Sequence, residues 1–197
     1  MINESNKASI DKKRAIVLHV CCGPCATYPA VFLANEYRII GYFYNPNIFP
    51  YAEWLKRFLA FKKFCENSDA IADYFPQNPL SGKEYGDEHQ RYLEAIKGSE
   101  DEPEGGARCL ACFRLRLEES ARFVKELGME IFTTTLTIGR NKRPEAINPI
   151  GNAAAKRYSL KFFEADWKKQ DGIKRACEIA RGHGLYRQNY CGCEFSP

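Results

Sequence analysis

The chain has 197 residues, of which 45% are hydrophobic and 27% charged, and its formal net charge is +4. These values are typical of a globular domain and exclude a largely disordered chain. No run approaches the roughly 18 apolar residues of a membrane span. Residues 1–14 are polar and do not resemble a secretory signal, so we expect them to form a flexible N-terminal arm. We therefore expect a cytoplasmic protein.

The first predicted element is a buried strand, AIVLHV at residues 15–20, which leads into the sequence CCGPC. Further strands are predicted at residues 37–44, 70–75, 129–136 and 160–165, and helices at 26–35, 51–67, 87–97, 108–128, 144–158 and 173–183. This alternation indicates an α/β fold with a mostly parallel open sheet of about five strands and helices on both faces. We expect residues 15–197 to form one domain, with residues 98–107 as an acidic, flexible surface loop.

Seven of the nine cysteines fall into three groups, which are Cys21/Cys22/Cys25, Cys109/Cys112 and Cys191/Cys193. Structural disulfides are rare in the cytosol, so metal binding or redox chemistry is the better interpretation of such groups. The first group follows a strand, and in open α/β sheets ligands bind beyond the carboxyl ends of the strands. Cys65 and Cys177 lie in helical patterns and are expected to be structural.

Three kinds of protein remain open on these residues. One zinc ion cannot bind all seven thiols. An iron–sulfur cluster uses up to four thiolates, so seven are enough for one. The sequence Cys22-Gly-Pro-Cys25 instead resembles the redox site of a thioredoxin-like thiol oxidoreductase. A zinc-stabilised RNA-binding module is the third hypothesis, and the metal content would separate the three.

The segments LHVCCGPC, RCLACFRLRL, FTTTLTIGRNK and LYRQNYCGC, in this order, resemble the epoxyqueuosine reductase family QueH over residues 15–196. The resemblance implies a fold like that of the nucleotide α-hydrolase (HUP) superfamily. It also implies the last step of queuosine biosynthesis, the reduction of epoxyqueuosine to queuosine in the tRNA anticodon. The implied cofactor is a 4Fe-4S cluster, and the implied partners are tRNA and an unidentified electron donor. The sequence CCGPC stands where ATP-using relatives carry SGGxDS, so we expect no ATP.

Deoxygenating an epoxide requires two electrons, a Lewis acid and a proton source. We expect the cluster ligands to be Cys21, Cys22, Cys109, Cys112, Cys191 and Cys193. Together with Cys25, these thiols would hold the cluster and a second, adjacent metal ion, iron or zinc, in a division that the sequence leaves open. The expected catalytic residues are Cys21 and Cys22 with Tyr190 and Asp166, and Tyr186 is a further candidate for the proton donor.

Charged residues suggest where tRNA would bind. The expected contacts are Arg140, Lys142, Arg143 and Arg187, with Tyr158 stacking on a splayed base; a solvated helix face is the alternative. Arg57 is expected on a helix surface with Lys56, Lys62 and Lys63. Arg108, Arg114 and Arg116 stand beside Cys109 and Cys112, and the alternative for Arg114 or Arg116 is a surface pair with Glu118 or Glu119. His19 is expected to be buried and hydrogen-bonded.

Overall fold

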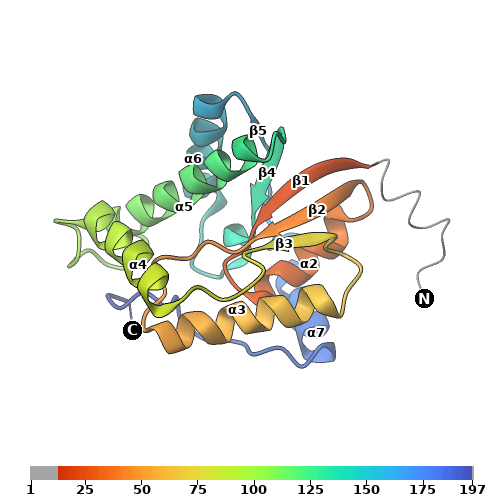
Figure 1. Ribbon diagram of the computed structural model, residues 1–197, viewed down its shortest axis with the longest axis horizontal. Helices are drawn as coiled ribbons and strands as arrows, with labels where there is room; N and C mark the ends of the chain where they lie inside the picture. The colour runs from red at the N-terminus through yellow and green to blue at the C-terminus, as the bar shows by residue number, and fades with distance from the viewer. Residues whose placement is uncertain (1–12, 197) are drawn as a thin grey trace.

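The computed structural model describes residues 13–196 and shows a parallel five-stranded sheet between two layers of helices (Figure 1). The strands are β1 (Arg14–His19), β2 (Tyr37–Tyr42), β3 (Asp73–Phe75), β4 (Ile131–Thr134) and β5 (Lys161–Phe162), in the order β3-β2-β1-β4-β5. Every neighbouring pair is parallel, so the predicted fold class is confirmed. The expected N-terminal arm lies mostly outside the described residues, and β1 begins at Arg14.

The helices cover both faces of the sheet (Figure 1). One layer contains α2 (Gly23–Leu33), α3 (Tyr51–Glu66) and α7 (Gly172–Gly182), and the other contains α5 (Ala107–Glu126) and α6 (Pro144–Tyr158). The helix α4 (Gly82–Ile96) packs against α5, and a short 3-10 helix, η1 (Leu136–Ile138), follows β4. Within residues 13–196, no helix combines the length and the apolarity that crossing a membrane requires.

The alternation of side chains along β1 divides the core into two parts. Ile16 and Leu18 pack in the cluster on the α2–α3 side, which includes Phe58. Val17 packs in the cluster on the α5–α6 side, which includes Leu117. A strand buried on both faces has no polar alternation, which explains the continuous apolar run at residues 15–20.

Two elements begin three or more residues earlier than the sequence predicted. The helix α4 starts at Gly82 rather than at residue 87, because Ser81 and Glu84 form a reciprocal capping box. The helix α2 starts at Gly23, so the CCGPC sequence forms a helix N-terminus rather than a loop. Gly23 is needed there for space and not for a left-handed backbone, because a Cβ atom would lie 2.6 Å from the backbone of Ala60.

Candidate functional site

A cavity of about 840 Å³ opens at the carboxyl ends of β1 and β4. The two strands are neighbours, but α2 follows β1 on one face of the sheet and α6 follows β4 on the other (Figure 1). Such a switch point leaves a crevice in which ligands of open α/β sheets bind. Three distant segments line the cavity, namely the start of α2 with Cys21 and Cys25, residues 139–142, and residues 187–191 of the tail.

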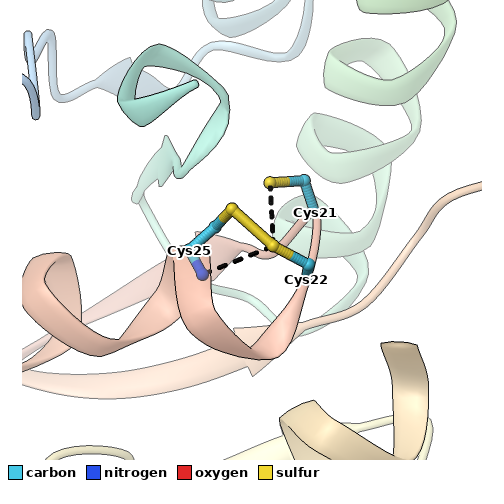
Figure 2. A group of neighbouring side chains, drawn as sticks. All are labelled: Cys21, Cys22 and Cys25. Atoms are coloured by element: carbon cyan, nitrogen blue, oxygen red, sulfur yellow. Dashed lines mark hydrogen bonds between the residues drawn. A yellow bond between two sulfur atoms is a disulfide. The ribbon is translucent and has the colours of Figure 1, made fainter. Parts of the chain in front are cut away.

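The first sulfur group consists of Cys21, Cys22 and Cys25, whose sulfur atoms lie within 4.8 Å of one another (Figure 2). Cys22 is the N-cap of α2, and its sulfur accepts a hydrogen bond of 3.3 Å from the backbone N–H of Cys25. The hydroxyl of Thr135, beyond β4, donates to the Cys21 sulfur over 3.3 Å. A helix N-terminus favours negative charge, so this position stabilises thiolates.

In the structure, Cys22 and Cys25 are joined by a disulfide, and the Cys21 sulfur lies 4.0 Å from that of Cys22 (Figure 2). The two sulfurs of a disulfide are not available as thiolate ligands. The same three residues therefore fit either a metal ion or a thiol–disulfide pair, but not both at once.

The second sulfur group consists of Cys109 and Cys112 on α5 with Cys191 and Cys193 of the tail. Cys112 and Cys193 share a small buried cluster with Tyr92, and Cys191 packs against it. The Tyr92 hydroxyl lies 2.9 Å from the Cys193 sulfur. Within residues 13–196, this group is not as compact as the first, which alone brings three or more metal-binding side chains so close together.

Both sulfur groups contribute to the lining of the cavity. Cys191 lines the same cavity as Cys21. Cys21 also packs against the apolar cluster that contains Cys109. The segment after β1 and the tail therefore reach the same cavity through their cysteines, and α5 reaches it through Arg116.

Lys142 supplies positive charge to the second group. Its ammonium donates to the Cys191 sulfur over 3.3 Å and lies over the ring of Phe113. Burial alone raises the pKa of the Cys191 thiol, but Lys142 outweighs this effect and brings that pKa below its usual value. Burial in turn lowers the pKa of Lys142, but the negative charge that Cys191, Cys112 and Cys109 carry when ionised more than compensates, so its pKa is raised.

Arg116 is a second buried cation beside these sulfurs. Burial raises the pKa of the Cys112 thiol to about 11, although the nearby guanidinium of Arg116 opposes the rise. Arg116 lines the cavity and donates to the side-chain oxygen of Asn45, whose amide in turn donates to the carbonyl of Val20. The nitrogen Nε of Arg116 has no hydrogen-bond partner, so this cation is held beside the sulfurs with unused donor capacity.

His19 is fully buried, as predicted, and connects the ends of three strands. Its Nε2 lies 3.1 Å from the carbonyl of Tyr44, which can only accept, so Nε2 carries the proton. Its Nδ1 then accepts from the Thr134 hydroxyl over 2.7 Å. Burial holds the pKa of His19 well below its usual value, which makes it a neutral structural link rather than a charged one.

An ion pair on α3 holds the tail in place. Arg57 donates from Nε to Glu53 over 2.6 Å and from a terminal nitrogen to the carbonyl of Cys191 over 2.7 Å. Its guanidinium also lies 4.9 Å from the ring centroid of Tyr190. A Cβ atom at Gly192 would lie 2.7 Å from Arg57, so this close approach requires glycine. We call Glu53 and Arg57 the tail clamp.

Only some of the expected substrate-binding and catalytic residues line the cavity. The residues that line it are Arg140, Lys142, Arg187 and Tyr190. The expected RNA contacts that do not line it are Arg143, which precedes α6 and is exposed, and Tyr158, which packs against the α5–α6 core.

The other two candidate proton donors lie outside the cavity lining. Asp166 forms an ion pair of 3.4 Å with Lys168. The ammonium of Lys168 also donates to the backbone carbonyl of Lys142 over 2.7 Å. Tyr186 donates its hydroxyl to Glu53 over 2.9 Å, so both side chains already have partners within the protein.

Two predictions about cations were wrong. Arg57 was expected on the exposed side of α3, but only 2% of the residue is exposed. The alternative of a surface pair between Arg116 and Glu118 or Glu119 was also wrong, because Arg116 contacts Asn45. Those two glutamates pair with other cations, which are Arg157 for Glu118, and Arg91 and Arg122 for Glu119. The available signal was that Arg57 follows Glu53 by four positions, within the apolar stripe of α3.

Cys177 also lines the cavity, although its place in a helical pattern led us to expect a purely structural residue. It lies on α7, which packs against α2 on the side of the first sulfur group. No pattern in the sequence near Cys177 marks it as a cavity residue, because only the packing of two distant helices brings it there.

A family model described as "Epoxyqueuosine reductase QueH" matches residues 16–197. Similar proteins carry the same name, Epoxyqueuosine reductase QueH. The one from Streptococcus pyogenes is 36% identical over 191 residues, which cover 92% of this chain and 70% of that protein. The one from Staphylococcus epidermidis is 36% identical over 185 residues, with coverages of 92% and 75%. The one from Thermotoga maritima is 33% identical over 181 residues, with coverages of 92% and 89%.

Proposed function

Because this chain belongs to the epoxyqueuosine reductase QueH family, we propose that it is the oxidoreductase that converts epoxyqueuosine in the anticodon of tRNA to queuosine. The observation that carries the proposal is that Cys21 and Cys191, from two distant segments, line one cavity at the end of the sheet. The reaction takes up two electrons and two protons, releases the epoxide oxygen as water and leaves a carbon–carbon double bond. The electrons come from a donor that is yet to be identified.

The first sulfur group fits a single metal ion. Two thiolates on a tetrahedral metal with bonds of about 2.3 Å are about 3.8 Å apart, and the sulfurs of Cys21 and Cys22 are 4.0 Å apart. We propose that Cys21, Cys22 and Cys25 hold one iron or zinc ion when the disulfide is reduced. Cys21 and Cys22 would thereby act at the reacting centre.

The second sulfur group suits the larger cofactor. A 4Fe-4S cluster takes four thiolates. Lys142 interacts with Cys109, Cys112 and Cys191, and Cys193 shares a buried cluster with Cys112. When bound, the cluster would supply single electrons and the metal ion would polarise the carbon–oxygen bond of the epoxide. Lys142 and Arg116 would offset the negative charge of these thiolates.

The cavity supports binding of an RNA loop. Arg140 and Arg187 are exposed cations on its lining, suited to phosphate contacts, and Arg143 would extend this surface beside α6. Tyr190 lines the cavity, which supports it as the candidate proton donor. Asp166 would act through Lys168, which bonds to the backbone of the cavity segment at Lys142.

The test is an anaerobic assay with tRNA that carries epoxyqueuosine and a chemical reductant. We expect the digested nucleoside to lose one oxygen atom by mass spectrometry, and the protein to contain iron. Cys193→Ser should remove the absorbance of the cluster and retain the single metal ion. Cys21→Ser should lose the single metal ion and retain the absorbance of the cluster. A colourless protein that holds only zinc and leaves the epoxide intact would favour an RNA-binding module.

The disulfide between Cys22 and Cys25 favours a second candidate function, a thiol oxidoreductase. This candidate predicts reversible reduction of that bond and disulfide exchange with a protein substrate, without bound iron. It also predicts that Cys109→Ser has no effect, whereas the reductase requires that thiol. Activity of Cys109→Ser with each substrate therefore separates the two functions.

A further inference from the structure

We propose that the ring of Tyr190 is a stacking platform, a fixed aromatic face on which a nucleobase of the tRNA substrate lies. The proposal deepens the proposed function and rests on it. Tyr190 lines the cavity, and 37% of the residue remains exposed. Next to it in the chain, Cys191 lines the same cavity, so a base on this ring would lie beside the second sulfur group.

The tail clamp contacts the ring of Tyr190 through Arg57. The guanidinium of Arg57 lies 4.9 Å from the ring centroid of Tyr190. Arg57 is itself immobilised by Glu53 and by the carbonyl of Cys191. An aromatic side chain that is already ordered loses little further conformational freedom when a ligand stacks on it, so its contact area contributes more fully to affinity.

The surroundings of the ring match a single-stranded RNA segment. Proteins recognise unstacked bases by stacking them on aromatic rings beside cations that contact the phosphates. Arg140 and Arg187 provide such cations on the same cavity. The volume of about 840 Å³ lies in the range of roughly 300–1,000 Å³ typical of ligand sites, which is enough for a splayed nucleoside.

Tyr186 provides a matched control in the same segment. It is exposed to a similar degree, 39%, and its hydroxyl contacts the tail clamp through Glu53. Unlike Tyr190, it does not line the cavity. A replacement of Tyr186 therefore removes a hydrogen bond to Glu53 but leaves the Glu53–Arg57 ion pair and the aromatic face in the cavity in place.

The experiment measures the dissociation constant of the metal-loaded, full-length protein for tRNA that carries epoxyqueuosine, at one fixed salt concentration. Tyr190→Leu should weaken binding by about 5- to 150-fold, the loss expected for one base–aromatic stack. Tyr190→Phe and Tyr190→Trp should keep the wild-type affinity because they keep the ring. Tyr186→Leu should also bind like the wild type.

Three results would overturn the platform. Tyr190→Leu could bind as tightly as the wild type, Tyr190→Phe could lose as much affinity as Tyr190→Leu, or Tyr186→Leu could lose as much as Tyr190→Leu. The second result would assign the effect to the hydroxyl, and the third to the tail clamp. If the wild type turns over its substrate while any of these results is found, the platform fails and the reductase function stands.

An RNA hairpin with the anticodon sequence identifies the stacked base. With an abasic site at the stacked position, the affinities of the wild type and Tyr190→Leu should converge, and at other positions their ratio should persist. A ratio that persists at every abasic position would contradict stacking. A wild-type protein that neither binds the tRNA nor reduces the epoxide would remove the proposed function, and the platform with it.

Discussion

Replacement of Arg57 by methionine tests whether the tail clamp holds the second sulfur group. The methionine keeps an unbranched apolar stem but leaves the buried carboxylate of Glu53 without its cation. It also removes the hydrogen bond to the carbonyl of Cys191. Breaking a buried ion pair from one side costs about 3–5 kcal/mol, which in a chain of this length lowers the melting temperature by roughly 6–20 °C.

The assay is chemical denaturation of the metal-free full chain, combined with the rate at which the Cys191 thiol is alkylated. We expect Arg57→Met to lower stability and to make Cys191 react several-fold faster. The double variant Glu53→Gln/Arg57→Met should lose less than the sum of its single changes, because it leaves no unpaired charge. Lys56→Met, which changes an exposed cation on the same helix, is the control and should stay within about 0.5 kcal/mol of the wild type.

Two results would refute this reasoning. Arg57→Met could be as stable as Lys56→Met, which would mean that the ion pair contributes nothing. Alternatively, Arg57→Met could lose stability while alkylation of Cys191 stays unchanged. The clamp would then support α3 alone, and the position of the tail would depend on Tyr92 and the cluster around it.

Three further variants test the sulfur environment, the packing and the charge pairs. Lys142→Met should raise the pKa of the Cys191 thiol in the metal-free chain, because it removes the cation that lowers this pKa; alkylation of Cys191 should then need a higher pH. Gly23→Ala should cost about 1–3 kcal/mol by denaturation, because its Cβ would meet backbone. The control Gly82→Ala has free space and a helical site, and it should be neutral or stabilising. Burial raises the pKa of Glu119, but neighbouring arginines outweigh it and leave that pKa lowered. This group therefore stabilises the fold above its unfolded pKa of about 4.3, and the gap between wild type and Glu119→Gln should close as pH falls below that value.

Local patterns predicted most of the fold. The apolar run at residues 15–20 indicated a strand buried on both faces, and β1 packs against both core clusters. The convergence of Cys21 with the residues after β4 followed from parallel topology, since the carboxyl ends of the strands share one edge. The prediction failed at the start of α4, where Gly82 and Gly86 suggested a loop and the capping box of Ser81 was overlooked.

Long-range partners explain the residues that the sequence did not identify. Arg57 bonds to the carbonyl of Cys191, 134 positions away, and Arg116 bonds to Asn45, 71 positions away. Neither pairing leaves a periodic signal, so a helix surface was the expectation for Arg57 and the alternative for Arg116. The position of the tail had no local basis either, because residues 185–196 form no helix or strand; only the family resemblance placed Cys191 and Cys193 near the other cysteines.

The surroundings of the two sulfur groups affect deprotonation of the thiols in different ways. Deprotonation matters because a metal binds the thiolate. The first group lies at the N-terminus of α2, where the helix favours thiolates. In the second group, Lys142 favours the thiolate of Cys191, while burial raises the pKa of Cys112 to about 11. Cys112 therefore keeps its proton at neutral pH in the metal-free chain, and a metal that binds there must displace it. Since each displaced proton makes binding pH-dependent, loading of the second group should weaken as the pH falls.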